Sequence, residues 1–282
     1  MATMKTTHCL SEMADALEVS KSGFHAHQCK QKRPRRQQDK ELLGVIEPLF
    51  IASRRTYGSP RMVHALRKTG RRCGKNRVAR LMRQGGLRPK QKRRFRPQTT
   101  QSDHKLPIAQ NWLAQIPAPD RPKQVWLADI TYIPTVEGWL YLSGILDACS
   151  RRCVGWQAAD SLGADLVTRA WNKAWKNQRP DPGLLHHSDR GIQYASSDFR
   201  ALLDSCGAAA SMSRKANCYD NATMESFWAT LKTECFGSLI PQTKQQAKLI
   251  LFDYIESFYN RSRLHSALGY RSPLEFENKF IT

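Results

Sequence analysis

The sequence predicts an α/β protein: a mixed five-stranded sheet with flanking helices, preceded by small all-α helix-turn-helix segments. Three observations lead to this expectation. The first hundred residues are basic and helix-patterned, β-branched and aromatic strand patterns begin at Lys123, and strands then alternate with helices. With 282 residues and 40% hydrophobic content, the chain is long enough for two domains with a buried core.

The formal net charge of +21 lies almost entirely in the N-terminal part of the chain. Residues 1–100 hold 25 of the 45 basic residues and 6 of the 24 acidic residues. Because Lys and Arg displace counterions condensed on phosphates, this asymmetry favours nucleic acid as a partner over the alternatives, membranes and acidic proteins. No apolar run is long enough for a signal peptide or a membrane span, so a cytoplasmic protein with no membrane partner is expected. The eight scattered cysteines include no C-x-x-C pair, which favours free thiols.

The first hundred residues predict two helix pairs. Residues 11–30 show two short helical stretches with a break at Val19, and Ser20 is suited to cap the second stretch. Residues 31–40 are charged and contain proline, which favours a linker. A second pair of helices is expected at 59–68 and 75–87, joined by the turn TGRRCG and ended by two consecutive glycines.

The second helix of that pair is expected to lay a basic surface on DNA. Val78, Leu81 and Met82 form an apolar stripe, whereas the basic side chains occupy other faces. A merely solvated face is the alternative. Residues 87–123 are again basic and rich in proline, which suits a tether along a phosphate backbone. The basic residues assigned to DNA in these two segments are Lys75, Arg77, Arg80, Arg83, Arg93 and Arg94.

The remainder predicts the sheet. Three consecutive strands are expected at 123–135, 138–148 and 151–159, then a helix at about 162–177, a strand at 182–189, a helix at 198–207, a strand at 208–213 and a helix at 221–234. A final amphipathic helix is expected at 248–270. In mixed sheets of this kind, ligands collect near the carboxyl ends of strands.

Three acidic residues stand where that rule places a site. Asp129 interrupts the apolar strand VWLADITYI, where burying a carboxylate is costly unless something, such as a metal ion, compensates its charge. Asp189 ends the fourth strand. Glu225 lies early on the helix that follows the fifth strand, on a margin that it shares with Asn221 and Lys232. Each acid taken alone is more simply a turn former, a cap or a solvated group.

A functional role for the three acids together is supported by four segments that follow one another along the chain: WLADITYIPTVEGWLYLSGILDACSRRCVGW, HHSDRGIQYASSDF, SMSRKANCYDNATMESFWATLKTE and FYNRSRLHSALGYRSPLEF. Through them, residues from about Tyr57 to Phe276 closely resemble the second-frame subunit (OrfB) of IS3-family insertion-sequence transposases, whose core is similar to retroviral integrase. Thirty-five residues separate Asp189 from Glu225, as in the D-D-35-E pattern of that family, and Lys232 follows seven residues after Glu225. The sequence departs from the usual wording at Ala216, where Gly is usual, and at Ile192, where Ser is usual.

The resemblance implies a ribonuclease-H-like core in which Asp129, Asp189 and Glu225 are catalytic and hold two Mg²⁺ ions, with Mn²⁺ as a substitute. Hard cations take carboxylate oxygens, and two such ions suit phosphodiester chemistry. The implied reactions are DNA cleavage at the element ends and strand transfer. Implied or expected DNA contacts in this core are Lys232, Arg214, Lys215, Asn217, Asn221, Gln193 and Tyr194.

The resemblance also sets expectations for domains and partners. Predicted divisions are a helical segment (1–50), a basic helix-turn-helix domain (51–98), a basic linker (99–122), the integrase-like core (123–240) and a C-terminal helix and tail packed on the core (241–282). Expected partners are double-stranded DNA from element ends and target, further copies of the chain, and the first-frame OrfA protein or an OrfA–OrfB fusion, in the bacterial cytoplasm. The rival readings are a DNA-binding regulator without catalysis and a structure-selective nuclease.

Overall fold

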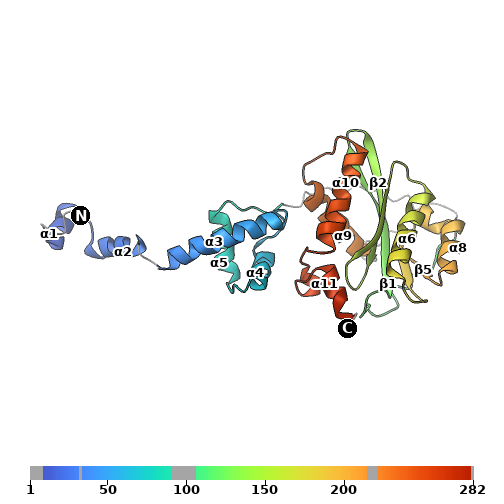
Figure 1. The fold of residues 1–282 in the computed structure, drawn as a ribbon, viewed down its shortest axis with the longest axis horizontal. Coiled ribbons are helices and arrows are strands. Elements are labelled where there is room, and N and C mark those ends of the chain that lie inside the picture. Colours follow the sequence, from blue (N-terminus) through green and yellow to red (C-terminus); the bar gives the residue numbers. More distant parts are fainter. Residues whose placement is uncertain (1–8, 32–33, 91–105, 215–220, 281–282) are drawn as a thin grey trace. The chain divides into compact units, whose positions relative to one another are not determined.

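The computed structural model describes residues 9–31, 34–90, 106–214 and 221–280, and the chain divides into two compact units, residues 1–88 and 89–282. The first unit is all-helical and the second contains the sheet (Figure 1). The fold class expected from the sequence is thereby confirmed. The predicted boundary at residues 50 and 51 falls inside a helix of the first unit.

The helical unit contains α1 (Leu10–Ala16), α2 (Lys21–Gln31), α3 (Pro34–Ala52), α4 (Ser59–Lys68) and α5 (Lys75–Gln84). The break expected after α1 is present, and Ser20 Oγ accepts a hydrogen bond from Gly23 N at 3.0 Å, as the predicted cap requires. The α4–α5 pair is also confirmed, with Val78, Leu81 and Met82 buried.

The linker predicted at residues 31–40 is wrong, because α3 begins at Pro34. Proline at the first position of a helix loses no hydrogen bond, so it starts a helix as readily as it ends one. Leu42, Ile46 and Phe50 then recur every four residues and are buried in the helical unit, where α3 packs on α4 and α5. The first turns of α3 are charged and show little helical pattern, and the packing of this apolar stripe stabilises the helix in spite of that.

The second unit is built on a five-stranded sheet in the order β3-β2-β1-β4-β5. The strands are β1 (Val125–Thr135), β2 (Gly138–Asp147), β3 (Cys153–Ala159), β4 (Leu185–Ser188) and β5 (Ala209–Met212). β1, β2 and β3 form an antiparallel meander, whereas β4 and β5 run parallel to β1. This is the strand order of the ribonuclease-H-like fold that the sequence leads us to expect.

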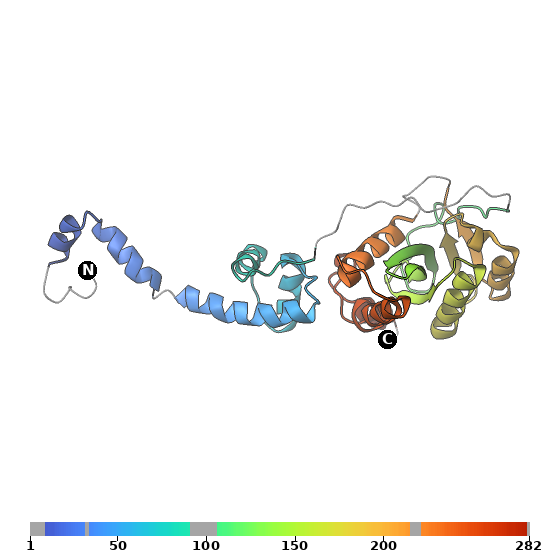
Figure 2. The ribbon, with the colours of Figure 1, turned by 90° about the horizontal axis from the view of Figure 1, so that it is seen from above.

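Helices cover both faces of this sheet. α6 (Ala164–Gln178) and α8 (Ser197–Ser205) lie on one side, with the short α7 (Ile192–Ala195) leading into α8. α9 (Ala222–Leu231) and α10 (Lys244–Phe252) lie on the other side (Figures 1 and 2). The α6 side holds a large aromatic core that includes Trp126 and Trp171, whose rings meet edge to face.

The C-terminal part continues the layer of α9 and α10. A π-helical turn (Lys232–Phe236) follows α9, and a second one (Asp253–Tyr259) follows α10. A 3-10 turn (Ser266–Leu268), α11 (Pro273–Glu277) and a last 3-10 turn (Asn278–Phe280) complete it. α10 contacts β1 and β2, so the expected packing of this part on the core is observed.

The single helix predicted at 248–270 is too long, because the helical backbone ends at Tyr259. The next side chain, Asn260, bonds to an edge strand. Its Oδ1 accepts from Cys153 N at 2.9 Å and its Nδ2 donates to Cys153 O at 3.0 Å. An asparagine amide can thus substitute for a strand partner, which no helical periodicity reveals.

Two further expectations concern the described residues. The cysteines whose side chains are described (Cys9, Cys73, Cys149, Cys153, Cys206 and Cys235) are free thiols. No helix in the described ranges is both long and apolar enough to cross a bilayer.

Candidate active site

Asp129 lies in the middle of β1, the central strand of the second unit, and its side chain is half-buried. Oδ1 accepts from Ile130 N at 2.8 Å and Oδ2 accepts from the indole Nε1 of Trp228 at 3.0 Å. Burial, together with the negative charges of Asp189 and Glu225, raises the pKa of Asp129 to about 7. The three predicted carboxylates are therefore electrostatic neighbours.

Asp189 follows the last residue of β4, at the carboxyl end of a strand parallel to β1. Its Oδ1 accepts from Gly191 N at 3.0 Å, which fixes the carboxylate at the tight turn before α7. The chain places this acid beside Asp129 because β1 and β4 are adjacent and point the same way.

Glu225 lies in the first turn of α9 and is exposed, five residues after residue 220, the last of a segment (215–220) that lies outside the described residues. Met224, Phe227, Trp228 and Leu231 form the buried stripe of this helix, as predicted. No three His, Cys, Asp or Glu side chains in the described part of the chain converge tightly enough to hold one metal ion together. Glu225 thus acts on Asp129 through its charge without completing a closed cluster.

Lys232 is half-buried at the end of α9, where burial lowers its pKa and the carboxylate of Asp129 opposes that shift. Asn221 stands at the N-cap position of the same helix without making a capping side-chain hydrogen bond, and it is 9% exposed. Its Nδ2 donates to Ala128 O at 3.5 Å, whereas its Oδ1 has no hydrogen-bond partner in the described residues. Lys232 and Asn221, both predicted from the sequence, therefore lie near Asp129.

The other residues predicted to contact DNA from the core or the segment before it are exposed or half-buried, outside the described residues, or buried. Arg214 is exposed and Gln193 is half-buried, with Gln193 Nε2 donating to Leu162 O at 3.4 Å. Lys215 and Asn217 lie outside the described residues, as do Arg93, Arg94 and Ala216. Tyr194 is 2% exposed, so the expected DNA contact by its side chain is incompatible with this structure.

Tyr194 is buried because α7 turns its side chain into the aromatic core. Its ring lies 5.7 Å from that of Phe199 and 5.8 Å from that of His186. A helix of four residues is too short to show a helical periodicity, so the sequence does not indicate that the Tyr194 side chain points into the core. Ile192, on the same short helix, is 42% exposed.

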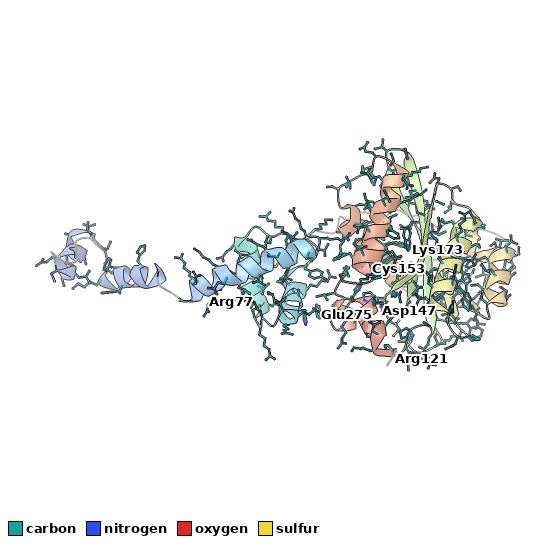
Figure 3. The ribbon with its side chains drawn as sticks, viewed as in Figure 1. Arg77, Arg121, Asp147, Cys153, Lys173 and Glu275 are labelled. Carbon is teal, nitrogen blue, oxygen red and sulfur yellow. The ribbon has the colours of Figure 1, made fainter. Side chains whose placement is uncertain are left out.

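In the helical unit, α5 carries four of the predicted contacts, and two of them are engaged within the unit. Arg77 Nη2 lies 2.8 Å from Asp39 Oδ1, and Arg80 Nη2 lies 2.6 Å from Asp39 Oδ2 (Figure 3 labels Arg77). Both guanidinium groups hold α5 against α3. Lys75 and Arg83 are exposed.

Sequence reasoning missed two residues that shape the site, Trp228 as a hydrogen-bond donor to Asp129 and Gly144. Gly144 pairs with Asp129 across β1 and β2, and a Cβ at position 144 would lie 2.6 Å from the Trp228 ring. The glycine therefore leaves room for the indole that reaches Asp129. Its only sequence signal is a glycine inside an apolar strand, which indicates a close approach without naming the partner.

A second missed pair anchors the ends of the segment that precedes α9. Arg190 Nε donates to Ser213 O at 2.8 Å, where the segment begins. Arg151 Nη1 donates to Thr223 Oγ1 at 2.5 Å, two residues before Glu225. Asp147, at the end of β2 (labelled in Figure 3), holds the turn before Arg151 by accepting from Ser150 N at 2.8 Å.

The family models that match this chain agree with this architecture. Residues 119–218 and 225–281 match families described as integrase core domains, and residues 37–95 match an HTH-like domain. The HTLV-2 integrase catalytic core domain in complex with magnesium (trimeric form) is 13% identical, with a TM-score of 0.43, over 56% of this chain and 98% of that one.

Two curated relatives match nearly the whole chain. An uncharacterized 31 kDa protein of insertion element IS600 from Shigella sonnei is 44% identical over 95% of this chain and 98% of the relative. Transposase InsF for insertion sequence IS3A from Escherichia coli (strain K12) is 39% identical over 96% of this chain and 94% of the relative. With both the helix-turn-helix and the integrase core matched in order, the chain belongs to the IS3 family of insertion-sequence transposases.

Proposed function

We propose that this transposase cleaves DNA at insertion-sequence ends and transfers the freed strand, with Asp129, Asp189 and Glu225 as its catalytic carboxylates. The observation that carries the assignment is the position of Asp129: a half-buried carboxylate in the central strand, subject to the charges of two further acids from β4 and α9. Such an arrangement is costly for a structural role and suits cation binding.

The donor set fits divalent metal ions, and we propose two Mg²⁺ ions, with Mn²⁺ as a substitute. Burial and the charges of Asp189 and Glu225 raise the pKa of Asp129, and a cation that neutralises this carboxylate would stabilise its ionised form. Asn221 Oδ1, which is buried without a partner in the described residues, is a further hard oxygen at the same place. When bound, two such ions activate the attacking oxygen and stabilise the leaving one.

The side chains around the acids hold them for this work. Ile130 N and Trp228 Nε1 fix both oxygens of Asp129, and Gly191 N fixes one oxygen of Asp189. Fixed carboxylates lose no further freedom when substrate arrives. Glu225 is exposed at the start of α9, so closing the group requires a shift of that helix start or of the side chain.

The proposed reaction has two steps at this one site. Water attacks the phosphorus at the element end, forms a new P–O bond and expels the 3′-oxygen, which leaves as a 3′-hydroxyl. That hydroxyl then attacks a second phosphodiester, and the old ester oxygen of that bond leaves as the new bond forms. The number of P–O ester bonds is conserved in the second step, so no ATP is consumed.

DNA contacts are proposed for the half-buried ammonium of Lys232, for Arg214, Gln193 and Asn221 around the carboxylates, and for the exposed Lys75 and Arg83 on α5. Lys215, Asn217, Arg93 and Arg94 are proposed on the sequence alone. Arg77 and Arg80 retain partly exposed guanidinium groups, so a phosphate contact requires them to share their charge with Asp39. We further propose that several copies assemble on DNA in the bacterial cytoplasm, alone or with an OrfA partner.

A strand-transfer assay tests this function. Wild type and Asp129→Asn are incubated with end-bearing duplex DNA and Mg²⁺, and joined products are separated on a denaturing gel, while duplex affinity is measured without metal. We expect Asp129→Asn to lose at least a thousandfold in joining while keeping wild-type affinity. Wild-type binding with no cleavage or joining would instead support a regulator.

A further inference from the structure

A hollow of about 560 Å³ lies at the turn between α4 and α5, lined by Arg67, Arg72 and Cys73. Arg67 comes from the last turn of α4, and the other two residues precede the first residue of α5. The hollow lies within the helical unit, and none of the α5 residues assigned to DNA above lines it. Nothing in the proposed function uses it.

The two guanidinium groups of the hollow have no ion-pair partner in the described ranges. Asp39, the acid that faces α5, is already engaged by Arg77 and Arg80. The charge of Arg67 reaches the groups around it: together with burial, which is the larger cause, it lowers the pKa of His64. Burial raises the pKa of Cys73, and the charges of Arg77 and, to a smaller extent, Arg67 oppose that rise. The hollow is therefore positive and uncompensated.

Phosphate is the anion that this arrangement suits best. Guanidinium forks bind phosphate oxygens in pairs, and two guanidinium side chains line this hollow. The first turn of α5 contains no acidic residue, and its N-cap, Gly74, offers no side-chain acceptor, so the amide groups there add to the positive field.

We propose that the hollow formed by Arg67, Arg72 and Cys73 binds a phosphodiester group of the DNA backbone. The inference rests on the proposed DNA binding by the helical unit and adds a specific backbone contact to it. A contact of this kind positions α5 on the duplex but reads no base. Cys73 lies in the wall of the hollow and is half-buried, so it reports directly on occupancy.

The first test measures duplex affinity of the full chain against salt for wild type, Arg67→Ala, Arg72→Ala and the neighbouring control Arg71→Ala. Each hollow variant is expected to bind about five- to tenfold more weakly, with the slope of log affinity against log salt reduced by about 1. Arg71→Ala is expected to change both quantities less. Equal losses in all three variants would show a general basic surface and overturn the proposal.

The second test follows alkylation of Cys73 by N-ethylmaleimide, with the modified peptide quantified by mass spectrometry. Short duplex DNA is expected to slow the reaction at Cys73 at least fivefold in wild type and not in Arg72→Ala, whereas inorganic phosphate at equal phosphate concentration is expected to have little effect. Protection by inorganic phosphate alone would identify a small-anion site and overturn the backbone assignment. Duplex binding without protection refutes the hollow only, whereas failure of wild type to bind duplex refutes the proposed function.

Discussion

At the scale of single residues, the shape of the site depends on Gly144 as much as on the acids. Gly144 faces Asp129 in the neighbouring strand, and the Trp228 indole occupies the space that a side chain at 144 would need. A buried indole ring between a sheet and a helix cannot move aside without moving α9, which also carries Glu225.

We therefore expect Gly144→Ala to displace Trp228 and break its bond to Asp129. Overpacking of this kind costs about 1–3 kcal/mol of unfolding free energy. Strand transfer should fall by roughly ten- to a hundredfold, because the carboxylate loses its fixed position. The control is Gly163→Ala, whose Cβ meets no atom within 4 Å. Urea unfolding and strand-transfer rates measure both effects, and a fully active Gly144→Ala variant would contradict the role of Trp228.

The pKa of Asp129 predicts a pH dependence of stability. Its folded pKa of about 7 is above the unfolded value of 3.8, so the folded state holds a proton that the unfolded state releases. This contribution is complete below about pH 4 and is lost as pH rises to 7, by up to about 1.4 kcal/mol per pH unit. Divalent metal should remove the loss, since it stabilises the ionised form.

The measurement compares urea unfolding of wild type and Asp129→Asn from pH 4 to 8 without metal and then with Mg²⁺. Relative to the variant, wild type should lose stability as pH rises in the metal-free series and regain it when Mg²⁺ is added. The comparison uses the slopes of unfolding free energy against pH. A hydrogen bond that asparagine fails to reproduce shifts the whole curve of the variant and leaves its slope unchanged. Parallel curves for the two proteins, with and without metal, would show that the pKa of Asp129 is not raised in the folded protein and would contradict the proposed carboxylate site.

His186 predicts the opposite slope in nearly the same window. It is buried against Trp171 and Phe199, and burial lowers its pKa from 6.5 to about 3, with His187 adding to the shift. The unfolded state therefore gains a proton first, and stability is lost as pH falls from 6.5 towards 3. His186→Phe should remove this acid lability, by about 1.4 kcal/mol per pH unit, in the same unfolding series. An unchanged slope below pH 6.5 would show that the ring titrates normally.

At the scale of elements, a buried ion pair joins the end of α9 to the C-terminal segment. Arg263 donates to Glu234 through Nε and Nη2, both at 2.6 Å, and Tyr254 Oη donates to the same carboxylate at 2.8 Å. Glu234 lies in the π-helical turn that begins at Lys232, so this pair holds the backbone next to a proposed DNA contact. π-helical turns in helices often mark functional positions.

Removing one partner of this pair should be more harmful than removing both. Arg263→Met leaves the carboxylate of Glu234 buried without its cation, which costs about 3–5 kcal/mol. The double variant Glu234→Gln, Arg263→Met removes the charge and should recover at least half of that loss. Urea unfolding of the single and double variants measures the difference. Additive losses would mean that the pair is not coupled.

An element can be predicted from the sequence when its own residues carry the pattern that forms it, and not when it depends on contacts with residues distant in the chain. The strands around Asp129 and the helix of Glu225 carry their own alternating or helical patterns, so sequence placed all three acids on the right elements. α3 was missed because its stripe of Leu42, Ile46 and Phe50 has meaning only once α4 and α5 pack on it. The end at Asn260 depends on a strand more than a hundred residues away in the chain.

At the scale of the whole molecule, the two compact units divide the charge unequally. Residues 1–88 hold 20 basic and 6 acidic residues, and residues 89–282 hold 25 and 18. The helical unit therefore has a net charge of +14 and the sheet unit one of +7, so the helical unit carries about two thirds of the excess positive charge that attracts a polyanion. The proposed catalytic carboxylates and most of the expected electrostatic attraction for DNA therefore lie in different units.

This division predicts how binding responds to salt when the units are separated at the boundary between residues 88 and 89. The fragment 1–88 should bind non-specific duplex with a steep fall of log affinity against log salt, because each phosphate contact releases counterions. The fragment 89–282 should show a slope at most half as steep, while circular dichroism and urea unfolding confirm that it is folded. Fluorescence anisotropy of a labelled duplex between about 50 and 200 mM salt measures both slopes. Equal slopes would place the main phosphate contacts on the core instead, and would require Lys232, Arg214 and their neighbours to supply them.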